Sequence, residues 1–468
     1  MSEIRALENL AGMRGNLKNF EFFCLVFAKL RIFFLISCTH TVKFLLHHQN
    51  NIMMELSKYT FGVGDRFSMQ GEAQLKALQM SLEKGIEIIP VWNKSNREHV
   101  TIGSVPAQTR HAADQAVKTL GWNKPYFVDA DHINKTNVDK FVDHCDFFTI
   151  DVADFIGKMA EESDLEAFIA TNKKFTGDFL IPGVEERFEI TENTLRKIAG
   201  KFLFSIKQAS EIYQYIYKKK GLNSFVTEIS MDEVNEAQTP IELFFILSAI
   251  ASEKIPVATI APKFTGRFNK GVDYVGDPGI FEKEFEQDLL VIDYAIKTFG
   301  LPEDLKLSVH SGSDKFSIYP IMGRLIKKHN KGIHIKTAGT TWLEEAIGLS
   351  LAGGEALEMI KNIYSRAIDR FDELTGPYAT VIDIDRKQLY LPSEIVYWSG
   401  EQLANALRHI PGHTAYNPHF RQLMHVAYKL AAEEGGRYLG LLKTHKEIVG
   451  QQVTENIFER HITRLFKL

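Results

Sequence analysis

Side chains of types that bind metal ions stand at the ends of apolar runs in this sequence. Three of them are His132, His310 and His334, which belong to three different runs. Neutral imidazole is the commonest metal ligand in proteins, and nearby carboxylates would complete a ligand shell that leaves a position open for substrate. No pair of histidines has the spacing of a zinc finger or of HExxH, so each one alone is also compatible with an ordinary core or surface position. Together they predict a divalent metal site that takes zinc, manganese, cobalt, nickel or iron.

Two carboxylates could transfer protons beside such a metal. Asp131 directly precedes His132, and Glu233 follows another apolar run together with Asp232. Carboxylates that come from different strands can act as acid and base on one substrate. The alternative for each is an ordinary ion pair with a neighbouring lysine or arginine. We take Asp131 and Glu233 as the acid–base candidates.

Cations and small polar residues at the same ends of the runs are candidates for substrate binding. A lysine there could hold a carboxylate or phosphate group, or form a Schiff base with a ketone. Because a metal site is also predicted, anion binding is the favoured role. The substrate-binding candidates are Lys263, Arg267, Ser311, Asp314, Lys315, Lys336 and Thr337.

The segments that must position these residues alternate from residue 59 onward. Short β-rich runs are separated by amphipathic stretches such as 138–145 and 282–300, a pattern typical of parallel strands buried on both faces. Eight such units predict a (β/α)8 barrel, whose active site lies at the carboxyl ends of its strands. A doubly wound open sheet is the alternative, although FGVGDRF lacks the glycine-rich fingerprint of a dinucleotide fold. The eight runs are 59–65, 86–92, 125–131, 146–152, 224–230, 256–262, 305–311 and 332–338.

The barrel is expected to span residues 54–345, with additions of other character. The long connection after the fourth run predicts an inserted helical pair near 155–222, and the pattern after the eighth run predicts an all-helical extension over 346–468. Residues 1–53 form an apolar leader in which Lys29 and Arg31 interrupt the longest apolar stretch. We expect this leader to be dispensable or spurious, with Met53 or Met54 as the natural start. The alternatives are an extra packed helix or a targeting or membrane segment.

Composition places limits on the class of protein. The chain is 45% hydrophobic and 24% charged, which indicates a folded globular protein rather than a disordered one. A formal net charge of −4 gives no basic surface for nucleic acid. The three cysteines cannot form a disulfide framework, so a cytoplasmic location fits best. We expect a small-molecule partner, no nucleic acid and no membrane, and we leave open whether the chain forms a homo-oligomer.

The sequence resembles the tagaturonate/fructuronate epimerases of the UxaE type. The resemblance covers roughly residues 54–468, and the longest matching motifs, HSGSDKFS and HIKTAGT, are specific. The matching stretches are FGVGDRF (61–67), DADH (129–132), FFTID (147–151), ISMDE (229–233), KFTGRFNKGVDYVGD (263–277), LSVHSGSDKFSIYP (307–320), HIKTAGTTWLE (334–344) and RQLMHVAY (421–428).

This resemblance implies a metal-dependent isomerase that interconverts D-tagaturonate and D-fructuronate in hexuronate catabolism. It implies Asp131 as proton acceptor, Glu233 as proton donor, and His132, His310 and His334 as metal ligands. A binding site that is not strongly selective for the carboxylate would also accept the neutral ketohexoses fructose and tagatose.

The chemistry of that reaction leaves two routes open. The inverted carbon lies one position beyond the carbon next to the ketone, so simple enolisation cannot invert it. Retro-aldol cleavage, rotation of the aldehyde and re-formation of the bond would invert it with the help of a metal. Direct deprotonation and reprotonation is the competing route. A metal-dependent aldolase or keto-sugar isomerase on the same fold is the alternative function, and a non-catalytic sugar-acid-binding barrel is a further one.

Overall fold

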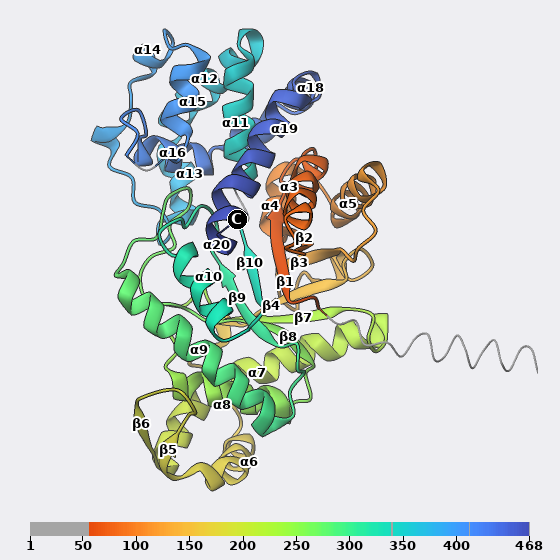
Figure 1. Ribbon diagram of the computed structural model, residues 1–468, viewed down its shortest axis with the longest axis vertical. Helices are drawn as coiled ribbons and strands as arrows, with labels where there is room; N and C mark the ends of the chain where they lie inside the picture. The colour runs from red at the N-terminus through yellow and green to blue at the C-terminus, as the bar shows by residue number, and fades with distance from the viewer. Residues whose placement is uncertain (1–55, 338–339, 411, 468) are drawn as a thin grey trace, which may run out of the picture. The chain divides into compact units, whose positions relative to one another are not determined.

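The computed structural model describes residues 56–337, 340–410 and 412–467. Eight parallel strands close into a barrel (Figure 1), with β1 paired to both β2 and β10. The predicted (β/α)8 barrel is therefore confirmed, and an open doubly wound sheet is excluded. The predicted apolar leader, residues 1–53, lies outside the described residues. In barrel order the strands are β1 (Tyr59–Gly64), β10 (Ile333–Lys336), β9 (Lys306–His310), β8 (Val257–Ala261), β7 (Val226–Ser230), β4 (Phe147–Asp151), β3 (Phe127–Ile133) and β2 (Ile89–Ser95).

Helices cover the outside of the barrel, and their ends carry local sequence signals. Thr239 caps α8 through a side-chain hydrogen bond from the amide of Glu242, and Asp277 caps α9 in the same way from Gly279. Every residue of β7 and β8 is buried, because the barrel interior covers one face and the helices cover the other. The helices that follow the strands are α3 (Gly71–Glu83), α4 (Asn96–Ile102), α5 (Pro106–Leu120), α7 (Glu192–Lys220), α8 (Pro240–Ser252), α9 (Pro278–Phe299) and α10 (Tyr319–Lys328).

The connection between β3 and β4 differs from the sequence prediction. Residues 138–145 have a helical pattern, yet they form only a 3₁₀ turn, η1 (Val138–Lys140), followed by further turns. The Asn137 side chain accepts a hydrogen bond from the amide of Asn134, which offers the backbone an alternative to a helix. This unit of the barrel therefore lacks an α-helix among the described residues.

The insertion after β4 is also more varied than the predicted helical pair. It contains η2 (Ala153–Phe155), α6 (Glu162–Asn172), η3 (Lys173–Phe175) and an antiparallel hairpin of β5 (Gly177–Leu180) and β6 (Arg187–Ile190). The hairpin was missed because residues 187–190 were read as part of a helix. Phe179 of β5 packs on Phe244 of α8, with ring centroids 5.0 Å apart, so the hairpin covers the outer side of that helix.

The C-terminal region is helical, as predicted. The described residues between 56 and 467 group into one compact unit, so this region is not set apart from the barrel. It has its own apolar core, which includes Trp342, Ile360 and Phe420. The predicted boundary at 345/346 falls inside α11. The elements are α11 (Thr340–Ala352), α12 (Gly354–Asp369), α13 (Phe371–Thr375), η4 (Gly376–Tyr378), η5 (Arg386–Gln388), α14 (Pro392–Ile395), α15 (Gly400–Leu407), α16 (Pro418–Val426), α17 (Tyr428–Glu433), α18 (Gly436–Thr444), α19 (Lys446–Glu455), the π-helical turn η6 (Asn456–Ile462) and α20 (Thr463–Phe466).

The end of the chain returns to the barrel. Ile457, Ile462 and Leu465 belong to the barrel core, where η6 packs on α3 and α20 packs on α10. These elements therefore take the place beside α3 and α10 that an eighth barrel helix would fill. Gly323 of α10 allows this contact, because a Cβ atom there would lie 1.7 Å from the carbonyl oxygen of Leu465. No helix among the described residues is long and apolar enough to cross a membrane.

Candidate active site and metal centre

A cavity of about 610 Å³ lies at the carboxyl ends of the barrel strands. This is the end at which enzymes of this fold carry their active sites. Among the described residues, its wall includes the predicted site residues Asp131, His132, Glu233, Lys263, Arg267, His310 and Lys336. The other predicted site residues are not part of that wall: Ser311, Asp314, Lys315, His334 and Thr337.

A bulge in β3 directs two successive side chains toward the cavity. The register with β4 shifts between Ala130 and Ile133, and His132 has a φ of +50°, in the left-handed region. Successive residues of a regular strand point to opposite faces, and a bulge breaks that alternation. Asp131 and His132 therefore both line the cavity, with Oδ1 of Asp131 2.8 Å from Nδ1 of His132. The left-handed conformation is uncommon for a residue with a side chain.

His132, Asp232 and His310 form the group among the described residues that could hold a metal ion. Oδ1 of Asp232 lies 3.5 Å from Nε2 of His132 and 3.1 Å from Nδ1 of His310. The three residues come from β3, from the loop after β7, and from the end of β9. Two imidazoles and one carboxylate are a donor set that suits a divalent transition metal and leaves coordination positions open.

The other ring nitrogen of each histidine is held by a carboxylate. Nδ1 of His132 bonds to Asp131, and Nε2 of His310 lies 2.9 Å from Oε1 of Glu228. Nε2 of His132 and Nδ1 of His310 are buried and form no hydrogen bond of good geometry, although both face Oδ1 of Asp232. Carboxylates commonly orient metal-bound histidines in this way. The two orphaned nitrogens therefore fit a metal ion at this place.

The electrostatics of the cluster favour a bound cation. Burial lowers the pKa of His310, but Asp232 and Glu228 outweigh burial and raise that pKa to about 9. Burial lowers the pKa of His132 as well, and Asp131 and Asp232 raise it well above its ordinary value. The surrounding carboxylates thus stabilise positive charge at both rings, and a divalent cation would supply it.

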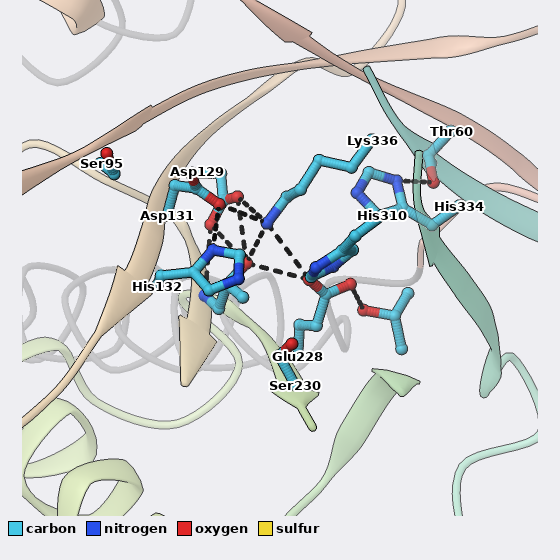
Figure 2. Close-up of polar contacts among 12 residues, drawn as sticks. Thr60, Ser95, Asp129, Asp131, His132, Glu228, Ser230, His310, His334 and Lys336 are labelled. Atoms are coloured by element: carbon cyan, nitrogen blue, oxygen red, sulfur yellow. Dashed lines mark hydrogen bonds and ion pairs between the residues drawn. The ribbon is translucent and has the colours of Figure 1, made fainter. Parts of the chain in front are cut away.

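Lys336 is bound to three buried carboxylates at the inner end of the cavity, as Figure 2 shows. Its Nζ lies 2.8 Å from both Asp129 and Asp131, 3.3 Å from Glu228, and 2.6 Å from the hydroxyl of Thr149. Burial lowers the pKa of Lys336, but the carboxylates outweigh burial and raise it well above its ordinary value. The lysine is therefore charged, and it keeps the neighbouring carboxylates at fixed positions.

His334 lies apart from this group. It shares the inward face of β10 with Lys336, two residues along the strand, and its Nδ1 lies 2.8 Å from the hydroxyl of Thr60. Figure 2 shows the ring turned toward Thr60 rather than toward the carboxylates. Burial lowers the pKa of His334 to about 3, so its ring is neutral. The geometry does not place this predicted ligand with His132 and His310.

Asp314 lies inside the protein, away from the cavity wall. Its carboxylate is fully buried and lies 2.8 Å from Nη2 of Arg421, 3.2 Å from Nδ1 of His409 and 3.3 Å from Nε2 of His461. Burial raises the pKa of Asp314, but Arg421 and His409 outweigh burial and hold that pKa well below its ordinary value. Asp314 therefore joins the loop after β9 to three C-terminal segments.

Three further substrate-binding candidates donate hydrogen bonds to backbone carbonyl groups. The buried Lys315 donates to the carbonyls of Asn269 and Val272. Ser311 donates to the carbonyl of Lys336, and Thr337 donates to the carbonyl of Gly62. These hydrogen bonds fix loops at the carboxyl ends of the strands.

The remaining candidates line the outer part of the cavity. Glu233 is exposed and Lys263 is half-buried. Arg267 is bound to Asp383, with Nη1 3.4 Å from Oδ2, and donates to the carbonyl of Ile382. Arg267 thus already has partners in the C-terminal region.

Sequence reasoning missed several residues of this site. Glu228 is a fully buried carboxylate in the middle of a strand. A charged residue inside a run that is expected to be buried is unusual, and this signal could have been found in the sequence. Asp151 ends β4 and lines the cavity, and burial raises its pKa. Arg66, which pairs with Glu98 at 2.9 Å, lies in the FGVGDRF stretch, yet nothing in the pattern marks it as a cavity residue.

The fold and the cavity define a (β/α)8-barrel enzyme with a candidate centre for a divalent metal. The model of the UxaE family, described as tagaturonate epimerase, matches residues 35–467. The chain belongs to this family, and it is an isomerase of the epimerase type.

Individual relatives agree with this assignment. The chain is 27% identical over 421 residues to the tagaturonate/fructuronate epimerase of Thermotoga maritima, an alignment that covers 87% of this chain and 80% of the relative. It has the fold of fructuronate-tagaturonate epimerase UxaE from Cohnella laeviribosi. The complex with one glycerol has a TM-score of 0.72 at 24% identity, and the native crystal structure 0.70 at 23%, each covering 88% of this chain and 82% of the other.

Proposed function

We propose that this chain is a metal-dependent epimerase that interconverts D-tagaturonate and D-fructuronate in hexuronate catabolism. The observation that carries the proposal is the convergence of two orphaned imidazole nitrogens, from His132 and His310, on Asp232 inside the cavity. Membership of the tagaturonate epimerase family and the name of the Thermotoga maritima relative support the substrate pair.

In this proposal His132, Asp232 and His310 hold the metal. When bound, a divalent metal acts as a Lewis acid that stabilises negative charge on substrate oxygens. Asp131 and Glu228 fix the two imidazole rings, so each ring presents its second nitrogen to the cavity. The proposed third histidine ligand, His334, is replaced by Asp232 in this arrangement.

Asp131 is the proposed proton acceptor. Burial raises its pKa, but Lys336 and His132 outweigh burial and hold that pKa below its ordinary value. Asp131 is therefore ionised, but its lowered pKa also makes it a weak base, so it would accept a proton from a substrate hydroxyl group that a bound metal had made more acidic. Lys336, 2.8 Å away, is charged and fixes the carboxylate that receives the proton. Glu233, which lines the outer part of the cavity, is the proposed proton donor.

The proposal extends to the partners and the location of the enzyme. The ligand is a keto-uronate, with the neutral ketohexoses fructose and tagatose as slower substrates. Lys263, Arg267 and Lys336 stay in the proposal as cations that line the substrate cavity. We place the enzyme in the cytoplasm, because three cysteines form no disulfide framework.

The test uses the full chain, stripped with a chelator and refilled with single divalent metals. D-Fructuronate is added, and D-tagaturonate is followed by chromatography for the wild type, His310→Ala and His111→Ala. His111 lies exposed on α5 and serves as the matched control. We expect metal-dependent conversion that His310→Ala abolishes and His111→Ala retains. Tight metal binding without conversion would contradict the substrate pair, and conversion by the metal-free protein would contradict the metal dependence.

A second measurement separates the two chemical routes. The reaction is run in deuterium oxide and the product is analysed for deuterium at the inverted carbon. Retro-aldol cleavage and re-formation break a carbon–carbon bond and leave the hydrogen of that carbon in place. Deuterium at the inverted carbon would therefore support proton transfer, and its absence would support the retro-aldol route.

A further inference from the structure

A lysine outside the predicted site residues lies in the cavity with its charge available to a ligand. Lys270 belongs to the loop between β8 and α9, lines the cavity and is half-buried. Within the part of the chain that the structure describes, no hydrogen bond or ion pair joins its Nζ to another residue. This separates Lys270 from Lys336, which is bound to three carboxylates, and from Arg267, which is bound to Asp383.

The backbone on both sides of Lys270 is held firmly. The amide of Lys270 itself donates to the carbonyl of Val381 at 2.8 Å. Nζ of the buried Lys315 donates to the carbonyls of Asn269 at 3.0 Å and Val272 at 2.8 Å. These bonds fix the backbone from which the Lys270 side chain enters the cavity, so binding a ligand would order the side chain but would not have to order the loop.

Gly271, the next residue, is held from two directions. Its amide donates to Oγ of Ser313 at 2.9 Å, and its carbonyl accepts from Nε of Arg421 at 2.7 Å. Ser313 lies in the loop after β9 and Arg421 lies in α16. The loop after β9 and helix α16 thus both hold the loop segment that carries Lys270.

The neighbouring loop leaves space for the ammonium group. Gly312 has a φ of +67°, and a Cβ atom at that position would lie 3.4 Å from Nζ of Lys270. The left-handed backbone favours a glycine there, while a Cβ atom would make only an ordinary van der Waals contact with the lysine.

The charges around Lys270 favour an anion. Burial lowers the pKa of Lys270, the carboxylates of Glu233 and Asp232 oppose this effect, and the cations Arg97 and Arg66 add to it. Arg97 and Arg66 both line the cavity. A bound anion would offset the repulsion among these cations and would form a charge-assisted hydrogen bond with the ammonium group.

We propose that Lys270 binds the carboxylate of the sugar acid and determines the preference of the enzyme for sugar acids over neutral ketohexoses. This inference rests on the proposed function for the identity of the substrate. A keto-uronate carries its carboxylate at the end opposite its ketone. Lys270 therefore sets which end of the substrate faces the loop after β8, and the ketone end is left to His132, Asp232 and His310.

The test compares charged and neutral ligands in the full-length metal-loaded protein. Calorimetry measures the binding of D-galactonate, a sugar acid without a ketone, and of galactitol, its neutral counterpart. The same preparations are assayed for kcat/KM with D-fructuronate and D-fructose. The variants are Lys270→Met, Lys270→Arg and the control Lys135→Met, whose lysine follows β3 at the same end of the barrel but pairs with the exposed Glu211.

Lys270→Met is expected to weaken galactonate binding by about 10- to 100-fold, the size of one charge-assisted hydrogen bond. It should lower kcat/KM for D-fructuronate by a similar factor and leave galactitol binding and D-fructose turnover within about threefold. Lys270→Arg should retain most of the preference, and Lys135→Met should equal the wild type. Equal losses for charged and neutral ligands, or no loss, would overturn the assignment. A selective loss of galactonate binding in a protein that converts no keto-uronate would uphold the carboxylate site and refute the proposed function.

Discussion

Oε1 of Glu228 lies 2.9 Å from Nε2 of His310, so the other nitrogen of that ring, Nδ1, faces the cavity. The second oxygen of Glu228 accepts a hydrogen bond from the hydroxyl of Thr259 at 2.7 Å. Glu228 is fully buried and is held at both oxygens. It therefore fixes the orientation of a proposed metal ligand without touching the substrate.

Glu228→Gln should weaken metal binding by about 10- to 100-fold, because the amide keeps the size of the side chain but removes the charge that orients and polarises the His310 ring. The measurement is competition for the metal between the purified protein and a chelator of known affinity. Glu345→Gln is the matched control, since Glu345 is equally buried but binds Tyr438 and Gln70. Unchanged metal affinity in Glu228→Gln would refute the orienting role.

His334→Gln should leave the stoichiometry and affinity of metal binding within about threefold of the wild type, since the ring bonds to Thr60 and lies apart from the metal group. Its stability should fall by about 1–3 kcal/mol, because the substitution disturbs a buried hydrogen bond. Both quantities can be measured on one preparation, by chelator competition and urea unfolding. His310→Gln, measured in parallel, should lose metal affinity. Equal losses in the two variants would restore His334 as a ligand.

The histidines show what a sequence can and cannot predict about this site. All eight strands were found, because buried parallel strands read as apolar runs. His334 and Lys336 are two residues apart on one strand and point into the same barrel. No sequence pattern shows which of the two lies at the cavity and which lies deeper in the barrel. Asp131 and His132 should point to opposite faces of a regular strand, and only the bulge between Ala130 and Ile133 brings both to the cavity.

The loop residues after β9 were harder to place from sequence. Asp314 and Lys315 follow a strand at the correct end of the barrel, which is why substrate binding was expected. Their partners come from distant parts of the chain, such as Arg421, and no local pattern encodes such a contact. Lys270, in contrast, lies in the matched stretch 263–277, but an isolated lysine in a loop has no distinguishing signal.

Asp314→Asn should lower the free energy of unfolding by about 3–5 kcal/mol, because it removes the nearer of the two carboxylates that face the buried Arg421 and leaves Glu344 at 3.9 Å. The KM of the remaining folded enzyme should equal that of the wild type, since Asp314 does not line the cavity. Urea unfolding and steady-state kinetics at low temperature measure the two effects. In the control Asp383→Asn, the lost ion pair with Arg267 is largely exposed, so the change should be below about 1 kcal/mol. A raised KM with unchanged stability would return Asp314 to substrate binding.

His99 should make the stability of the protein depend on pH. The ring is buried in α4, and its Nδ1 lies 2.9 Å from Oγ of Ser104. Burial lowers the pKa of His99 to about 4 from its ordinary 6.5, with Lys94 adding to this effect and Glu98 opposing it. Between pH 6.5 and 4 the unfolded chain binds a proton that the folded protein does not. The stability that the neutral ring contributes is therefore complete above pH 6.5 and is lost as the pH falls through that window.

The comparison of His99→Gln with the wild type tests this dependence, because glutamine keeps a polar group but cannot titrate. Urea unfolding at pH 8 and pH 5 should show the variant less stable than the wild type at pH 8, with the difference shrinking or reversing at pH 5. His111→Gln, which changes an exposed histidine of α5, should follow the wild type at both pH values. If the stabilities of His99→Gln and the wild type fall in parallel, the ring is not the group responsible. If the difference in stability from the wild type narrows at pH 5 for His99→Gln and not for His111→Gln, part of the acid sensitivity is assigned to α4. This helix follows β2 and contributes Arg97 to the cavity wall.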